Sequence, residues 1–182
     1  VCESVVKLLP GGSELRFTKD KTDYYVPANY KYLDATDQDM GGSSAVVLPD
    51  IKGRHLLVTA GKDGLVYLLD RENLGGVGGE LYKRRLLGDP SSSYHSNIKT
   101  TPAYFDAGDD DKMVYLTGNE KGPKGEAGVI ALKLTFGDKK KVELANLWTL
   151  PSVLNQPGAP YVSSSGSKDG IVCAKHNLTV ME

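Results

Sequence analysis

The tripeptide Lys-Asp-Gly occurs twice, at residues 62–64 and 168–170, and each copy precedes a short apolar run. An Asp-Gly pair supplies the positive φ angle that a tight hairpin turn requires. We therefore expect four structural turn residues at the same place in two similar units: Asp63, Gly64, Asp169 and Gly170. Repeats of this kind are typical of propellers and solenoids, in which one unit cannot bury its apolar faces alone.

Short strands joined by turns account for most of the chain. The sequence holds 21 glycines, 9 prolines and 10 tyrosines but few helical periods, a pattern that favours strands. A long connection rich in Tyr and Asp is expected from Asp23 to Met40. The strands are predicted near residues 4–9, 14–17, 45–48, 55–60, 65–70, 80–87, 100–105, 113–117, 128–134, 142–149, 159–163 and 170–174.

Several of the predicted strands are apolar on both faces, notably 56–58, 65–69 and 128–132. A strand of this type lies in a sheet that is covered on both sides. No amphipathic helix is visible between these strands, so other sheets are expected to cover them, as in stacked blades. The charged run 81–86 suits the outer edge of a blade. The sequence therefore predicts an all-β fold, a β-propeller of four-stranded antiparallel blades.

The chain is expected to form a single partial propeller domain over residues 1–182, with about two complete blades and parts of two more. The predicted divisions are a blade part at 1–33, blades at 41–88 and 96–150, and a blade part at 157–182. A start at Val1 without methionine suggests an internal or processed piece. The expected partners are the remaining blades or another chain that completes the propeller, so we expect the isolated chain to be marginally stable or to associate.

At this point the chain resembles the quinoprotein-like β-propeller family, whose units are called pyrroloquinoline-quinone (PQQ) repeats. Residues 41–48 resemble its blade-opening strand, and Gly61–Asp70 resembles its characteristic hairpin, a Gly-x-Asp-Gly turn followed by a strand ending in Leu-Asp. Residues 100–104 and 113–115 repeat the pattern less closely. The resemblance implies a propeller and a periplasmic or secreted location.

Two features of the quinoprotein alcohol dehydrogenases are missing from this sequence. Their tryptophan-docking motif would follow the Leu-Asp strand, where residues 71–76 contain no tryptophan, and Trp148 is expected on an outer strand. Their vicinal disulfide is also absent, because no two cysteines are adjacent. We therefore favour a non-catalytic PQQ-like repeat module that serves as a binding or scaffold surface for protein or ligand. No catalytic residue and no cofactor are predicted.

Two enzymatic alternatives stay open. The chain would be part of a quinoprotein-type oxidoreductase if PQQ, calcium and the catalytic residues lay outside this segment of the full-length protein. A propeller lyase or hydrolase would use channel residues such as His95. No nucleophile elbow, P-loop or paired-cysteine zinc motif is present.

The candidate ligand contacts are His95 and Asn97, in a polar loop that leads into the third unit. Loops of this kind face the central channel of a propeller, although a structural, hydrogen-bonded loop histidine is the simpler interpretation. Asp34, Asp37 and Asp39 are a weaker alternative, a calcium loop. A calcium loop has five ligands at alternate residues and a closing glutamate, and this segment has neither. We therefore favour a structural role for these aspartates and predict no metal.

Charge and apolar content exclude several partners. The net charge is −1, and the lysine run 139–141 lacks interleaved aromatic residues, so nucleic acid is not expected. The acidic run 109–111 is expected to be solvated. No apolar stretch is long enough for a membrane span.

The two cysteines, Cys2 and Cys173, lie near opposite ends of the chain. A disulfide between them would close a ring, but spacing alone does not show pairing. Cys173 lies in an apolar run, so we expect it to be a small buried residue instead. Residues 177–179 fit the N-glycosylation pattern, which is common by chance.

Overall fold

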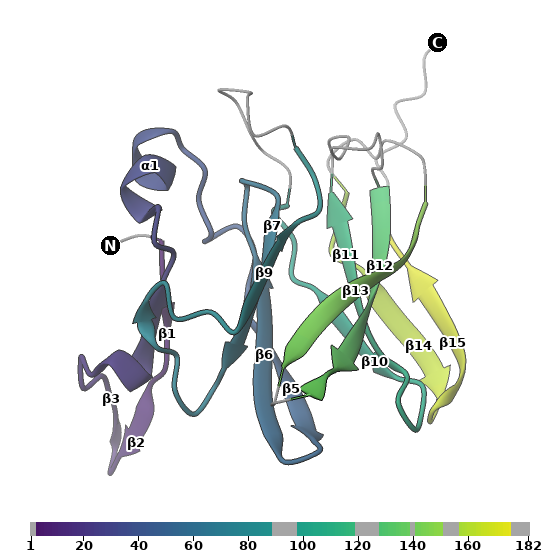
Figure 1. The fold of residues 1–182 in the computed structure, drawn as a ribbon, viewed down its shortest axis with the longest axis horizontal. Helices are drawn as coiled ribbons and strands as arrows, with labels where there is room; N and C mark the ends of the chain where they lie inside the picture. Colours follow the sequence, from purple (N-terminus) through teal and green to yellow (C-terminus); the bar gives the residue numbers. More distant parts are fainter. Residues whose placement is uncertain (1–2, 89–97, 119–127, 139–140, 151–156, 176–182) are drawn as a thin grey trace.

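The computed structural model describes residues 3–88, 98–118, 128–138, 141–150 and 157–175. Its sheets stand side by side from the N-terminal to the C-terminal end of the molecule (Figure 1). The helices in these residues are the 3-10 helix η1 (Lys21–Asp23) and the α-helix α1 (Tyr30–Ala35). Within the same ranges, no helix has the length and apolar character needed to cross a membrane.

Two complete four-stranded antiparallel sheets form the centre of the molecule. The first, blade A, has the order β5 (Val46–Ile51), β6 (Arg54–Ala60), β7 (Leu65–Asp70) and β9 (Tyr82–Arg85). The second, blade B, has the order β10 (Ala103–Asp106), β11 (Lys112–Gly118), β12 (Gly128–Phe136) and β13 (Val142–Thr149). The expected all-β, partial propeller fold is confirmed by these stacked antiparallel sheets.

Smaller sheets flank the two blades. On the N-terminal side lie the three-stranded sheet of β1 (Val5–Val6), β4 (Tyr24–Val26) and β8 (Gly76–Val77), and the hairpin of β2 (Leu9–Gly11) and β3 (Glu14–Arg16). On the C-terminal side lies the hairpin of β14 (Tyr161–Ser165) and β15 (Lys168–Cys173). Among the residues that the structure describes, these smaller sheets form the two ends of the stack.

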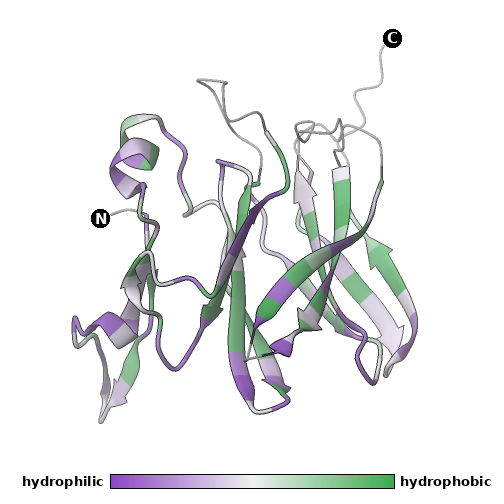
Figure 2. Ribbon diagram, viewed as in Figure 1, coloured by the Kyte–Doolittle hydropathy of each residue, from purple (hydrophilic) through white to green (hydrophobic). Residues whose placement is uncertain are grey.

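The middle strands bury side chains on both faces, as their apolar sequences predict. Leu68 packs in the cluster between blades A and B, whereas the adjacent Leu69 packs in a second cluster with Tyr25, Met40 and Leu74. Both leucines are fully buried. Figure 2 shows hydrophobic residues along the middle strands and a hydrophilic β9 at the edge of its sheet. Sheets cover these strands on both sides, because a strand of a single exposed sheet alternates polar and apolar residues.

The N-terminal strands differ from the two strands predicted near residues 4–9 and 14–17. Val5 and Val6 pair with β4, and the tight hairpin begins only at Leu9. The expected connection from Asp23 to Met40 contains β4 and α1. Val5 packs against the buried cluster that contains Tyr25 and Leu57. Burial against blade A therefore determines which strand Val5 and Val6 pair with, and the local order of polar and apolar residues does not.

The glycine-rich run 75–79 contains the short strand β8. Two parts of its backbone lie close together, because a Cβ atom added at Gly79 would be 2.5 Å from the Cα of Gly75. No other residue type fits this approach without displacing the chain. The run therefore lets β8 pair in parallel with β4.

The two Lys-Asp-Gly copies occupy different places. The first forms the turn between β6 and β7, where Gly64 has a φ of 78°. In the second, the turn falls earlier, at Gly166, and Asp169 and Gly170 lie inside β15. The pairing of β14 with β15 shifts register here, and Asp169 has a φ of 54°. The second copy is therefore part of a bulge in a strand.

Cys173 is exposed, contrary to the prediction of a buried residue. It lies on β15, in the last sheet of the described residues, with Tyr161 as its cross-strand partner. Ile171, in the same apolar run, is 63% exposed. Cys2 lies outside the described residues, so the disulfide stays a prediction.

Candidate functional site

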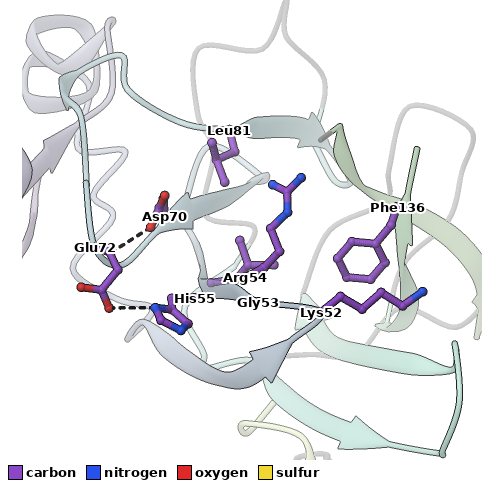
Figure 3. Close-up of a pocket in the computed structure, with 9 residues that line it drawn as sticks. Lys52, Gly53, Arg54, His55, Asp70, Glu72, Leu81 and Phe136 are labelled. Carbon is purple, nitrogen blue, oxygen red and sulfur yellow. Dashed lines mark hydrogen bonds and ion pairs between the residues drawn. The ribbon is translucent and has the colours of Figure 1, made fainter. Parts of the chain in front are cut away.

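An open groove of about 500 Å³ lies between the two blades, at the end where β6 begins (Figure 3). Its walls come from the β5–β6 turn, the ends of β7 and β12, and the segment before β9. The lining residues are Lys52, Gly53, Arg54, His55, Leu56, Asp70, Glu72, Leu81 and Phe136. Figure 3 shows Lys52 and Arg54 on the side of Phe136, and His55 with Glu72 on the other side.

The β5–β6 turn positions the basic side of the groove. Lys52 and Gly53 have φ angles of 55° and 71°, and the Gly53 N–H donates to Oδ1 of Asp50 at 2.8 Å. The turn directs Lys52 toward blade B, where its Nζ lies 2.5 Å from Oδ1 of Asp110. The same Nζ lies 5.3 Å from the centroid of the Phe136 ring, a cation–π distance. Lys52 thus connects the two blades, and the acidic run 109–111 is paired here instead of simply solvated.

His55 lies between two carboxylates at the acidic side of the groove. Its Nε2 is 3.0 Å from Oδ2 of Asp50, and its Nδ1 is 3.2 Å from Oε1 of Glu72. The Gly53 N–H, followed by His55, lowers the pKa of Asp50. Both imidazole nitrogens therefore have protein partners. The lining combines charged side chains with Leu81 and Phe136, so the arrangement suits binding of charged and apolar groups.

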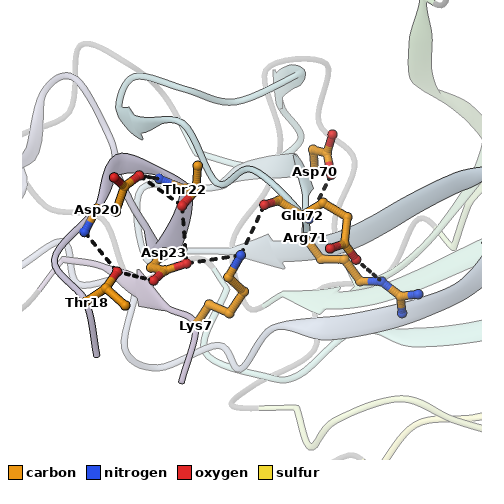
Figure 4. Close-up of polar contacts among 8 residues, drawn as sticks. All are labelled: Lys7, Thr18, Asp20, Thr22, Asp23, Asp70, Arg71 and Glu72. Carbon is orange, nitrogen blue, oxygen red and sulfur yellow. Dashed lines mark hydrogen bonds and ion pairs between the residues drawn. The ribbon is translucent and has the colours of Figure 1, made fainter. Parts of the chain in front are cut away.

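A series of polar contacts ties the acidic side of the groove to the N-terminal sheet (Figure 4). The Glu72 N–H donates to Oδ1 of Asp70 at 2.8 Å, and the Arg71 Nε is 3.7 Å from Oε1 of Glu72. Lys7 donates to the Glu72 carbonyl oxygen at 3.1 Å and lies 3.1 Å from Oδ1 of Asp23. The Glu72 backbone is therefore held from both sides.

The carboxylate of Asp23 is also fixed by hydroxyl groups (Figure 4). Thr18 donates to its Oδ2, and Thr22 donates to its Oδ1 at 3.3 Å. The Thr18 hydroxyl is the main cause that lowers the pKa of Asp23, with Lys7 contributing in the same direction. Asp23 thus stays ionised and anchors Lys7.

The sequence-predicted ligand contacts, His95 and Asn97, lie outside the described residues, so their role stays a prediction. The groove was missed because its two sides are far apart in the chain: Phe136 and Lys52 come from different blades. The only local signal was the turn at 52–53. Nothing in the sequence pairs that turn with the end of β12.

Two of the three aspartates of the calcium alternative pair with a lysine, and the alternative itself stays a prediction. Nζ of Lys62 lies 3.0 Å from Oδ1 of Asp37 and 2.6 Å from Oδ2 of Asp39, whereas Asp34 is an exposed residue of α1. Lys62 is the main cause that lowers the pKa of Asp39. Its ammonium group therefore neutralises part of the charge of these two carboxylates. In the described ranges, no group of three or more His, Cys, Asp or Glu side chains is arranged to hold a metal.

Comparison with protein-family models finds no match, and comparison with curated proteins finds none either. Among solved structures, the chain is similar to the crystal structure of BamB from Moraxella catarrhalis, with a TM-score of 0.40 and 16% identity. The match covers 76% of this chain and 39% of that chain, so it spans about two fifths of the BamB chain. The assignment of the fold rests on the strand pairing described above, and this likeness adds nothing to it.

Proposed function

We propose that the chain is a non-catalytic, PQQ-like propeller module that binds a segment of a protein partner in the groove between blades A and B. The observation that carries the proposal is the mixed character of the groove. Lys52 and Arg54 supply positive charge, Asp70 and Glu72 supply negative charge, and Leu81 and Phe136 supply apolar surface.

This combination suits a polypeptide ligand. Polypeptides offer charges of both signs beside apolar side chains, and charge complementarity of this kind favours specific association. The Phe136 ring beside Lys52 gives a flat apolar surface, and aromatic and arginine residues are enriched where binding energy is concentrated. The imidazole of His55 is bonded to protein carboxylates, so it acts here to hold the acidic wall.

The test is a selection of peptides from a random displayed library against the whole chain. Selected peptides are expected to bind at least about tenfold more weakly to an Arg54→Glu variant, because one groove charge is reversed. Arg16→Glu is the matched control, since Arg16 is exposed on β3 and lies outside the groove. Peptides that bind both variants and the parent chain equally would contradict the groove as the binding site.

The second candidate is a part of a quinoprotein-type oxidoreductase. The neutralisation of Asp37 and Asp39 by Lys62 disfavours calcium at those residues, so this function depends on residues elsewhere. Dye reduction by alcohols or sugars, after PQQ and calcium are added to the full-length protein, tests it. Turnover under these conditions would replace our proposal.

The location implied by the PQQ-repeat resemblance, periplasmic or secreted, belongs to the same proposal. Fractionation of cells that express the full-length protein tests it. Recovery in the cytoplasmic fraction would contradict the assigned location but leave the binding function to be tested separately.

A further inference from the structure

His55 lies between two carboxylates that come from different elements. Its Nε2 is 3.0 Å from Oδ2 of Asp50, on β5, and its Nδ1 is 3.2 Å from Oε1 of Glu72, which follows β7 (Figure 3). An ionised carboxylate only accepts hydrogen bonds, so each contact needs an N–H group on the ring. A neutral imidazole carries one N–H group, and an imidazolium carries two. The two contacts together are therefore those of the protonated ring.

The two carboxylates differ in how they are held. Asp50 is the cross-strand partner of His55, and its Oδ1 accepts the Gly53 N–H at 2.8 Å. That N–H is the main cause that lowers the pKa of Asp50, so Asp50 stays an ionised acceptor at neutral pH. The Glu72 side chain is 66% exposed, and its Oε1 is 3.7 Å from Nε of Arg71, beyond hydrogen-bond distance. We therefore expect loss of one ring proton to break the contact with Glu72 and to keep the contact of Nε2–H with Asp50.

Charged groups of both signs surround the imidazole. They are Asp50 of β5, Lys52 of the β5–β6 turn, Arg54 of β6, Asp70 at the end of β7, Arg71 and Glu72 after β7, and Lys7 after β1. Lys52 and Arg54 lie on the side of Phe136 (Figure 3). The Glu72 N–H donates to Oδ1 of Asp70, so these two acidic residues belong to one backbone segment. Histidine is the side chain whose charge ordinarily changes between pH 5 and 8, so the protonation of His55 sets how negative this side of the groove is.

We propose that the protonation of His55 determines whether the groove binds a cationic side chain. When the imidazole is neutral, the Glu72 carboxylate is released and, with Asp70, binds a lysine or arginine side chain of the partner segment. When the ring is protonated, the imidazolium pairs with Glu72 and competes with that side chain. The identity of the ligand rests on the proposed function, whereas the change at His55 does not.

The change at His55 is tested on the whole chain without a ligand, by 15N NMR of the imidazole nitrogens. His55→Gln identifies the His55 signals. From pH 5 to pH 8, we expect Nδ1 to lose its proton and Nε2 to keep its proton almost completely. The chain unfolded in urea is the reference, because a free imidazole is a mixture of the two tautomers. A ring that keeps its Nδ1 proton at pH 8 would show that Asp50 is released instead of Glu72, and would overturn the proposal.

The effect on binding is tested by selecting peptides from a random, histidine-free displayed library against the whole chain, in parallel at pH 5 and pH 8. We expect lysine and arginine to be enriched in the peptides selected at pH 8. These peptides should bind about threefold more weakly at pH 5, because an exposed ion pair contributes little to affinity. Equal enrichment at the two pH values would overturn the proposal.

Three variants separate the contribution of His55 from other effects of pH. His55→Gln should remove the difference in affinity between pH 5 and pH 8, and Glu72→Gln should reduce it. Glu14→Gln is the matched control that should leave the difference unchanged, since Glu14 is exposed on β3 and lies outside the groove. Circular dichroism checks that the variants are folded. Selection of no peptide at either pH would contradict the proposed function, and the NMR titration would still decide the change at His55.

Discussion

The Tyr67 hydroxyl donates a hydrogen bond of 3.0 Å to Oδ2 of Asp63, four residues earlier in the same hairpin. Oδ1 of Asp63 accepts the Leu65 N–H at 3.1 Å, and Arg85 donates to the Asp63 carbonyl oxygen. Burial is the main cause that raises the pKa of Tyr67, and the Asp63 charge adds to it. The aspartate of the first Lys-Asp-Gly copy is therefore a buried hydrogen-bond acceptor that holds the backbone of its own turn.

Replacing Asp63 should destabilise the chain strongly. Asp63→Ala leaves the Tyr67 hydroxyl and the Leu65 N–H without this acceptor in a buried site, which costs about 1–3 kcal/mol in the free energy of unfolding. Chemical denaturation measures the loss. Asp169→Ala is the control, because Asp169 is exposed, and a loss of equal size there would contradict the difference between the two copies.

Gly170→Ala should weaken the packing of β14 and β15 on blade B. The added methyl group meets the Phe105 ring at 2.7 Å, and overpacking of this kind costs about 1–3 kcal/mol. Hydrogen exchange should show faster exchange in residues 161–173, and thermal melting should occur at lower temperature. Gly41→Ala is the matched control, since an added Cβ there meets nothing within 4 Å. Unchanged exchange in Gly170→Ala would show that the contact does not hold the hairpin.

The pairing of Lys62 with Asp39 should make stability depend on acid pH. The lowered pKa of Asp39 means that its ionised form is favoured in the folded state. Its contribution is therefore present above the ordinary aspartate pKa of 3.8 and is lost as the pH falls through the lower, folded value.

Lys62→Met should accordingly reduce the loss of folding stability that protonation of Asp39 causes at acid pH. It should also lower stability at neutral pH by less than about 1 kcal/mol, because the pair is partly solvated. Denaturation at a series of pH values from 2 to 7 checks both effects. Lys141→Met is the control, since the pair of Lys141 with Glu143 is more exposed. A pH profile identical to that of the parent chain would rule out the pairing.

Glu3 should have the opposite pH dependence. Burial is the main cause that raises its pKa above the ordinary glutamate value of 4.5, although the Met40 N–H donates to its Oε2 at 2.5 Å. The protonated form is favoured in the folded state, so the contribution of Glu3 is present below pH 4.5 and is lost as the pH rises through the folded value.

Glu3→Gln keeps an oxygen acceptor for Met40 without a charge, so it should raise the melting temperature at pH 7 more than at pH 4. Thermal melting at the two pH values measures the difference. Glu14→Gln is the control, because Glu14 is exposed on β3. A lower melting temperature for Glu3→Gln at pH 7 would show that the ionised form is the stabilising one.

The middle strands were predictable because their sequences are apolar at every position. Leu68 and Leu69 point to opposite faces, and such a strand needs cover on both sides wherever it lies in the sheet. The edge position of β9 could also be predicted, from the charged residues Lys83, Arg84 and Arg85. The turn at Gly64 follows from local backbone preference.

The groove and the neutralised aspartates were not predictable in the same way. Lys52 reaches Asp110 across 58 positions, and Lys62 reaches Asp39 across 23. No local period or turn motif encodes either contact. The same holds for Asp169, whose tripeptide is identical to the first copy but lies in a bulge.

Short-range physics thus accounts for the strands, the first turn and the all-β class, because each depends on the residues immediately around it. The stacking of sheets accounts for the rest. Whether Val5 pairs with Tyr25, whether Cys173 is covered and which charges share the groove depend on which faces meet. Burial of apolar surface determines which faces meet, and this driving force is non-directional. The sequence of a strand therefore predicts that its faces are covered, but it does not predict which sheet covers them.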